Sequence, residues 1–319
     1  MIKKDFSFSL YEGSRKWVCP QCGQKTFVCY VDSNAEVIDE TCGRCDREDK
    51  CGYHLPPREF YKNNGIVPMV CNKPTYKQET KPSYMEPCIL EKTMCHYENN
   101  ALTNFLCDYF PSDEVIELVG RYFVGTAQKW NGSTVFWYVD KHNNIRGGKI
   151  MKYDRATGKR VKEPFNHVTW GHKEMELKDY NFKMCLFGEH LIDEHFNGSG
   201  ERVIVVESEK TALILMLALQ KAVWASQLVV ACGGCGGISA KMLEPLFGRD
   251  VLFIPDEGMY ENWSSRVNAL SDKFKSAVVS DIMERVAKNK GDDIGDYIIE
   301  HIQYLDYLLT ETIYPQLKK

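Results

Sequence analysis

The most regular alternation of apolar and polar segments lies in the last third of the chain, from Arg202 onward. Short apolar runs are separated there by segments with helical periodicity; the runs are VIVV, LVVA, VLFIP and SAVVS, and the helical segments include EKTALILMLALQKA and ENWSSRVNALSDKF. Strands that alternate with helices are typical of a parallel sheet with crossover connections. The pattern therefore predicts an α/β domain over residues 199–319.

Residues 88–198 have a different pattern, which predicts a small α+β module. Residues 89–110 and the following segment SDEVIELV indicate two helices, the second with Ser112 as its N-cap. The strand-like segments RYFVGTA, STVFWYVD and RGGKIMKYD come next, accompanied by the turn signals NG, HNN and TG. Residues 63–87 contain four prolines and no periodicity, so they are predicted to be a linker.

Residues 1–62 hold a cluster of cysteines that indicates a small zinc ribbon. Six of the 13 cysteines lie between Cys19 and Cys51, in a segment too short and polar to fold on a hydrophobic core alone. The CPxCG motif at Cys19 and Cys22 can turn two thiolates towards one ion. The second half of the cluster offers four further candidates, Cys42, Cys45, Cys51 and His54. Structural zinc takes four ligands, so at least two candidates stay out, and spacing alone suits a site through Cys42 and Cys45.

Composition and charge narrow the classes of protein to which this chain can belong. The 319 residues are 44% hydrophobic, which is ordinary for a globular protein, and the net charge of −4 gives no general attraction to nucleic acid. No stretch approaches the roughly 18 apolar residues of a membrane span, and MIKKDFSFSL lacks the apolar run of a signal peptide. We therefore expect a cytoplasmic protein with no membrane partner.

One concentrated positive region interrupts this acidic chain. Residues 141–162 hold eight lysines or arginines against one aspartate, and two adjacent glycines would let a phosphate backbone approach closely. Aromatic side chains nearby could stack on bases; they are Trp137, Tyr138 and Tyr153. We expect Arg146, Lys149 and Lys152 to bind a DNA backbone or an incoming triphosphate. A solvated hairpin without a ligand is the alternative interpretation.

Acidic residues gather where the strands of the last domain end. Two follow VIVV, two follow VLFIP and three precede the terminal helices; they are Glu207 and Glu209, Asp256 and Glu257, and Asp292, Asp293 and Asp296. Ligands bind at the carboxyl edge of a parallel sheet, and Mg²⁺ prefers hard oxygen ligands. Taken singly, each acid could cap a helix or complement its dipole, and for Asp292 or Glu209 that role is favoured. Together they favour a site for Mg²⁺ or Mn²⁺.

Four motifs of this domain resemble the toprim domain of bacterial primases, topoisomerases and related nucleases. They are the glutamate that closes the first strand (VVESEK), the Gly-rich turn ACGGCGG, the acidic turn PDEG and the late GDDIGDY. With the CPxCG motif upstream, the order is similar to the zinc-finger and catalytic-core order of bacterial and phage primases. Longer segments, among them GRCDREDKCGYH and RGGKIMKYDRATGKRVK, resemble a group of uncharacterised toprim-like proteins carried on bacterial mobile elements.

The resemblance implies roles for particular residues. It implies a Rossmann-like toprim fold and a zinc site made by Cys19, Cys22, Cys45 and Cys51. It implies that Glu207 is the toprim glutamate, that Asp256 is the first acid of the DxD motif, and that Asp293 is the later acid. These three would be catalytic, with Mg²⁺ or Mn²⁺ on Glu207 and Asp256. We also expect Lys210, just after the first of these acids, to bind nucleic acid or nucleotide. Ser208 stands where primases usually have glycine, and Gly258 stands where the second DxD aspartate would be.

The sequence therefore favours a primase-like protein that processes nucleic acid, with a zinc ribbon, an α+β middle module and a toprim domain. It would bind single-stranded or template DNA, and nucleoside triphosphates if it is active, during replication or mobilisation. The alternatives are a toprim nuclease and a catalytically inactive DNA-binding accessory protein. No GKS/T phosphate loop is present, so a helicase would be a separate partner.

Overall fold

The chain folds into two compact units, which a computed structural model shows as Met1–Glu79 and Thr80–Lys319. The structure describes residues 8–32, 35–47, 50–65, 81–197, 202–221, 227–234 and 237–313. Most of the predicted linker, residues 66–80, lies outside the described residues.

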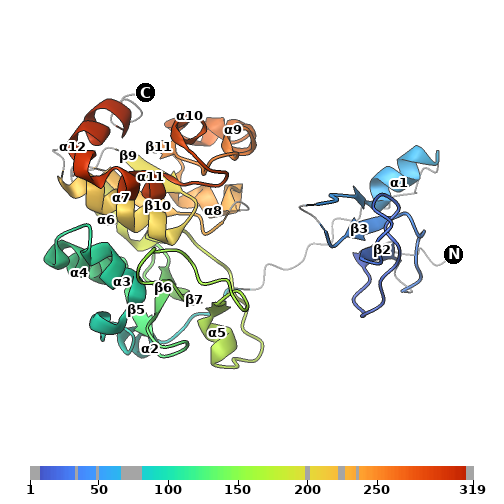
Figure 1. The fold of residues 1–319 in the computed structure, drawn as a ribbon, viewed down its shortest axis with the longest axis horizontal. Coiled ribbons are helices and arrows are strands. Elements are labelled where there is room, and N and C mark those ends of the chain that lie inside the picture. The colour runs from blue at the N-terminus through green and yellow to red at the C-terminus, as the bar shows by residue number, and fades with distance from the viewer. Residues whose placement is uncertain are drawn as a thin grey trace. The chain divides into compact units, whose positions relative to one another are not determined.

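The first unit is a small antiparallel sheet. Its strands are β1 (Ser9–Leu10), β2 (Phe27–Val31), β3 (Gly43–Cys45) and β4 (His54–Leu55), in the order β1-β2-β3-β4, and the helix α1 (Pro57–Asn63) follows (Figure 1). A small core of Trp17, Phe27 and buried cysteines lies beneath the sheet. Gly43 is required on β3, because a Cβ atom there would lie 2.2 Å from the carbonyl oxygen of Val28.

The second unit begins with helices that differ from the prediction. They are α2 (Pro87–Glu91), the 3₁₀ helix η1 (Tyr97–Asn99), α3 (Ala101–Cys107) and α4 (Ser112–Arg121). The single helix predicted over 89–110 is wrong, because His96 has a φ of 56° and Asn100 caps a new helix with its side chain. Ser112 is the first residue of α4 rather than its N-cap; Pro111 holds that position.

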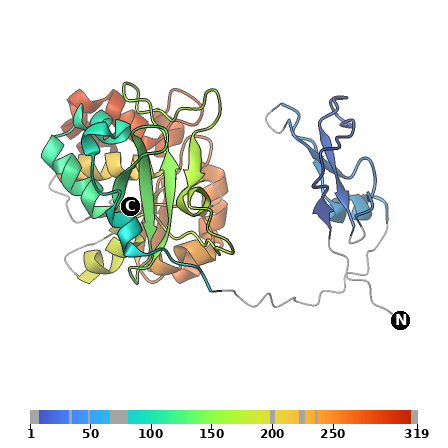
Figure 2. The same ribbon diagram turned by 90° about the horizontal axis from the view of Figure 1, so that it is seen from below.

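An antiparallel sheet follows in the order β5-β6-β7-β8 (Figure 2). Its strands are β5 (Val124–Ala127), β6 (Ser133–Val139), β7 (Ile145–Met151) and β8 (Val168–Trp170). The first three confirm the predicted strands. Met85 pairs with Ile145, so the end of the predicted linker packs on this sheet instead. Short helices complete the region: α5 (Gly171–Glu174), η2 (Glu189–Leu191) and α6 (Ile192–Asn197).

A parallel sheet confirms the predicted alternation of strands and helices. Its strands are β9 (Arg202–Val206), β10 (Gln227–Ala231), β11 (Asp250–Phe253) and β12 (Ser276–Val279), in the order β10-β9-β11-β12. The helices are α7 (Glu209–Lys221), α8 (Ala240–Leu243), α9 (Tyr260–Asn268), α10 (Ile282–Val286), α11 (Ile294–Glu300) and α12 (Leu305–Leu308). Single turns lie at η4 (Glu244–Leu246), η5 (Ser271–Lys273) and η6 (Ile302–Tyr304), and a π-helix spans Leu309–Ile313.

The strand order creates a topological switch point. From β9 the chain crosses to β10 on one side, whereas from β11 it crosses to β12 on the other side. The helix α7 packs against β9, β10 and α11 (Figure 1). In sheets of this kind the crevice outside the carboxyl ends of the two diverging strands is where ligands bind. Here that crevice lies between the ends of β9 and β11.

The two sheets of the second unit share one hydrophobic core. Phe187 pairs with Ala231 at the end of β10, and the Tyr122 hydroxyl donates to the carbonyl oxygen of Val229 at 2.7 Å. The boundary predicted at residues 198/199 therefore falls inside one compact unit. Within the described residues, no helix has the length and apolar character needed to cross a membrane.

Candidate functional site

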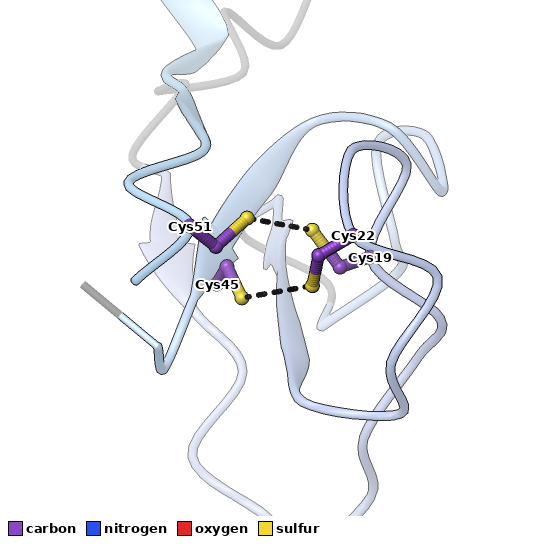
Figure 3. Close-up of side chains that lie close together, drawn as sticks. All are labelled: Cys19, Cys22, Cys45 and Cys51. Atoms are coloured by element: carbon purple, nitrogen blue, oxygen red, sulfur yellow. Dashed lines mark hydrogen bonds between the residues drawn. The ribbon is translucent and has the colours of Figure 1, made fainter. Parts of the chain in front are cut away.

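Four cysteines of the first unit bring their sulfur atoms together. The Sγ atoms of Cys19, Cys22, Cys45 and Cys51 all lie within 4.8 Å of one another (Figure 3). Cys19 Sγ is 3.7 Å from Cys51 Sγ, and Cys22 Sγ is 4.0 Å from Cys45 Sγ. A tetrahedral zinc with Zn–S bonds of about 2.3 Å would hold its sulfurs about 3.8 Å apart. The arrangement therefore fits a structural zinc with no open position for water.

Local backbone and hydroxyl groups favour the thiolate form of two of these cysteines, Cys22 and Cys45. At Cys51 a backbone hydrogen bond at Tyr53 lowers the pKa, but burial and the three neighbouring thiols raise it overall to about 12. Gly23 has a φ of 67° and donates its N–H to the Cys19 carbonyl oxygen at 2.9 Å, which closes the turn of the CPxCG motif. A hydrogen bond from the Gln24 backbone lowers the pKa of Cys22 to about 7. The Thr26 hydroxyl lies 3.4 Å from Cys45 Sγ and lowers the pKa of that thiol. Thiolates are the form that binds zinc.

The other candidate ligands of this unit have different surroundings. Cys42 is fully buried, and burial raises its pKa to about 11, as it does for Cys29. His54 shares a hydrogen bond of 3.0 Å with the Tyr30 hydroxyl through its Nε2 atom. The four thiols that come together are therefore the set implied by the resemblance to toprim proteins. The alternative zinc site, which the spacing suggested and which uses Cys42, does not form.

A cleft of about 650 Å³ lies in the second unit, where the strands β9 and β11 end. Its lining includes four carboxylates that come from separate parts of the chain. Glu207 directly follows β9, Asp256 follows β11, and Asp293 and Asp296 lie at the start of α11. The fold thus brings the three acids predicted to be catalytic to one cleft.

The carboxylates of the cleft repel one another. Burial, and then the charges of Glu207, Asp293 and Asp296, raise the pKa of Asp256 to about 8. Burial also raises the pKa of Asp293. Among the described residues, the cysteine cluster is the only group in which three or more metal-binding atoms of His, Cys, Asp or Glu all lie within 4.8 Å of one another. The acids therefore surround the cleft without forming a closed cage of three carboxylates.

Asp293 is the N-cap of α11. Its Oδ1 accepts from the Asp296 N–H at 2.8 Å, and its Oδ2 accepts from the Thr211 hydroxyl at 2.7 Å. This capping role is the one that the sequence favoured for Asp292 or Glu209. Asp292 instead accepts backbone N–H groups of the preceding turn at Lys288 and Asn289.

Lys210 lies among these acids. Its Nζ is 2.7 Å from Asp296 Oδ1, and its side chain is only 11% exposed. Burial lowers the pKa of Lys210, but the charges of Asp293 and Asp296 outweigh burial and raise it overall. The side chain therefore remains an ammonium inside the cleft.

Lys149 also lines the cleft, but its charge is paired. Its Nζ lies 2.9 Å from Glu209 Oε1, and the Tyr138 hydroxyl donates to the same oxygen. Glu209 is fully buried, so it does more than complement the dipole of α7. Lys149 thus neutralises a buried carboxylate.

Two predicted basic ligands lie outside the cleft, and the aromatic residues predicted to stack on bases are buried. Arg146 Nε donates to Asp140 Oδ2 at 2.7 Å, and neither Arg146 nor Lys152 lines the cleft. The aromatic side chains predicted to stack on bases are buried, which leaves no exposed ring face; Trp137 and Tyr138 lie in the core, whereas Tyr153 also lines the cleft.

A basic rim borders the cleft, and three of its four members lie in the positive region 141–162, although the sequence did not identify them individually as ligands. Its members are exposed side chains of the turns after β7 and before α11: Lys159, Arg160, Lys162 and Lys290. None of them makes an ion pair with another described residue. The turn signal TG could have located it, because the chain folds back there and pairs Arg160 with Tyr153.

Two family models match parts of the chain. Residues 100–257 match a family model described as a domain of unknown function (DUF6371), and residues 4–66 match a model of a zinc beta-ribbon finger. No curated protein matches the chain. The zinc-ribbon match and the four converging thiols together support a structural zinc in the first unit.

Among solved structures, the chain is similar to the primase fragment of the bacteriophage T7 primase-helicase, with 16% identity, a TM-score of 0.41, and coverage of 93% of this chain and 98% of that chain. The Escherichia coli primase catalytic core has 11% identity and a TM-score of 0.43 over 72% and 77% of the two chains. The RNA polymerase domain of Mycobacterium tuberculosis primase has 12% identity and a TM-score of 0.34 over 67% of each. Because each TM-score is below 0.5, these likenesses assign no role to any residue.

Proposed function

We propose that this protein processes nucleic acid by phosphoryl transfer that depends on Mg²⁺ or Mn²⁺, as a primase-like nucleotidyltransferase. One observation carries the proposal: carboxylates at the topological switch point face an exposed basic rim across a single cleft. A divalent cation and a polyphosphate or polynucleotide require such opposite charges side by side. The resemblance to toprim domains supports the same chemistry.

Glu207 and Asp256 would hold the metal ion. Both supply hard carboxylate oxygens, and the mutual repulsion that raises the pKa of Asp256 is what a bound cation would relieve. The ion would neutralise charge that develops on the phosphoryl group. Asp293 would position the other acids through its cap on α11 rather than bind substrate.

The basic rim would hold the phosphates of a nucleoside triphosphate or of the growing strand. Its exposed cations, among them Lys159 and Arg160, are near the acids but are not neutralised by them. In the first unit, Arg15, Lys16 and Lys25 line a groove of about 600 Å³ and would contact a single-stranded DNA template. Contacts of this kind with phosphates are salt-sensitive.

Primer synthesis on single-stranded DNA, with nucleoside triphosphates and Mg²⁺ or Mn²⁺, tests the proposal. Glu207→Gln and Asp256→Asn should each lower the rate at least about 100-fold, because loss of a metal ligand removes several kcal/mol of transition-state stabilisation. Glu257→Gln is the matched control, since the Glu257 carboxylate accepts from the Gly291 N–H and does not line the cleft. Unchanged synthesis in both cleft variants would refute the assigned site.

The same assay separates two other functions. Metal-dependent nicking of DNA without nucleoside triphosphates, abolished by Asp256→Asn, would indicate a nuclease. Salt-sensitive DNA binding without any metal-dependent turnover would indicate an inactive accessory protein. Gly258, which leaves the acidic turn with one carboxylate fewer, favours neither synthesis nor nicking over the other.

A further inference from the structure

Six acidic side chains line the cleft, and two of them are already engaged, Glu209 by Lys149 and Asp292 by backbone N–H groups. The other four carboxylates separate into two pairs. Glu207 and Asp256 follow the strands β9 and β11, at the switch point itself. Asp293 and Asp296 belong to the start of α11. The two pairs differ in how the protein already uses them.

The pair on α11 is engaged by the protein. Both oxygens of Asp293 accept hydrogen bonds, one from the Asp296 N–H and one from the Thr211 hydroxyl. Asp296 accepts from Lys210 Nζ at 2.7 Å. Lys210 is the second residue of α7, and with 11% of its side chain exposed it lies inside the cleft rather than on its rim.

Asp256, at the end of β11, is in a different environment from the pair on α11. Within the described part of the chain, the Asp256 carboxylate makes no hydrogen bond or ion pair, and the like charges of three neighbouring acids outweigh the opposite charge of Lys210 there. The turn that follows it carries Gly258, with a φ of 80° and an N–H that donates to Glu284 Oε1 at 2.9 Å. This turn supplies no second inward carboxylate.

We propose that Lys210 is a built-in counter-cation, so that the cleft takes one divalent cation at Glu207 and Asp256 and excludes a second from the pair on α11. An ammonium that already pairs with Asp296 supplies positive charge where a second metal ion would have to bind. It also repels such an ion at short range, where charges interact strongly because little water separates them. The inference rests on the proposed metal chemistry, and it makes Lys210 the residue that limits how many metal ions the cleft binds.

Mn²⁺ binding to the full-length, zinc-loaded protein tests this role without any activity assay. Calorimetric titration and the paramagnetic resonance of bound Mn²⁺ should give one bound ion in the wild type and none in Asp256→Asn. Lys210→Met, which keeps the unbranched shape and most of the length of the side chain but not its charge, should bind a second ion. Adding Asp296→Asn to Lys210→Met should remove that second ion, and Lys210→Arg should retain a count of one.

The outcomes distinguish this inference from the function on which it rests. Two ions in the wild type, or one ion in folded Lys210→Met, would overturn the role of Lys210 and leave the proposed phosphoryl transfer intact. No binding in the wild type would overturn both. If Lys210→Met fails to fold, Lys210→Gln makes the same comparison, because its amide can still donate to Asp296.

Discussion

At the scale of single residues, the electrostatics of the cleft centre on Asp256. Its pKa of about 8 in the folded protein compares with an ordinary value of 3.8. Between these values the folded state holds a proton that the unfolded chain has released, so stability falls as the pH rises through this window. The acidic site therefore costs the apoprotein stability at neutral and alkaline pH, as expected where carboxylates are held together for a ligand.

Asp256→Asn should remove this cost. We expect its gain in the free energy of unfolding to be larger at pH 8.5 than at pH 5.5 by roughly 1–3 kcal/mol, a value below the full shift because the structure can relax. Denaturant unfolding of the second unit at both pH values, without added divalent metal, measures the difference. Glu257→Gln is the control and should show little pH dependence. A gain for Asp256→Asn that is the same at both pH values would contradict the raised pKa.

Some residues of this cleft could be predicted from the sequence, and others could not. Glu207 and Asp256 follow apolar runs directly, so their shared edge follows from the parallel alternation alone. The partner of Lys149 is Glu209, 60 residues further on, and nothing in the local pattern shows that a buried carboxylate will neutralise it. Residue-level prediction therefore succeeded where strand topology decides and failed where packing between distant segments decides.

At the scale of elements, the strands were predicted more accurately than the helices. The strand β6 is buried along its whole length, and its apolar and aromatic run identifies it. The helix expected over 89–110 is instead divided, because the Asn100 side chain accepts from the Leu102 and Thr103 N–H groups and begins a new helix. Asparagine competes for backbone hydrogen bonds in this way, which periodicity does not reveal.

The strand β7 offers an element-scale test through two lysines. Lys149→Met should lower the free energy of unfolding by roughly 3–5 kcal/mol, because it leaves the fully buried Glu209 without its cation. Lys152→Met, just beyond the same strand, should change it by about 0.5 kcal/mol or less, since no ion pair joins Lys152 to another described residue. Urea unfolding of the two variants measures the difference. Equal effects would show that the ion pair contributes nothing to stability.

At the scale of the whole molecule, the two units are stabilised in different ways. The second unit has an extensive apolar core that includes the parallel sheet and α7. The first unit has only a small cluster around Phe27, in which cysteines supply much of the packing. A core of that size cannot offset the conformational entropy of some 50 residues, so the metal must supply the difference.

Zinc removal should therefore unfold the first unit and leave the second folded. Cys45→Ser should lose zinc, and hydrogen exchange should then show loss of protection in β2 and β3 but not in β9 or β11. Cys42→Ala is the matched control, because this neighbouring thiol is buried, neutral and outside the cluster; it should keep one zinc per chain. Zinc content by atomic emission, measured beside hydrogen exchange, gives both readouts. Loss of zinc from Cys42→Ala would place Cys42 in the site, as the alternative set through Cys42 and Cys45 requires.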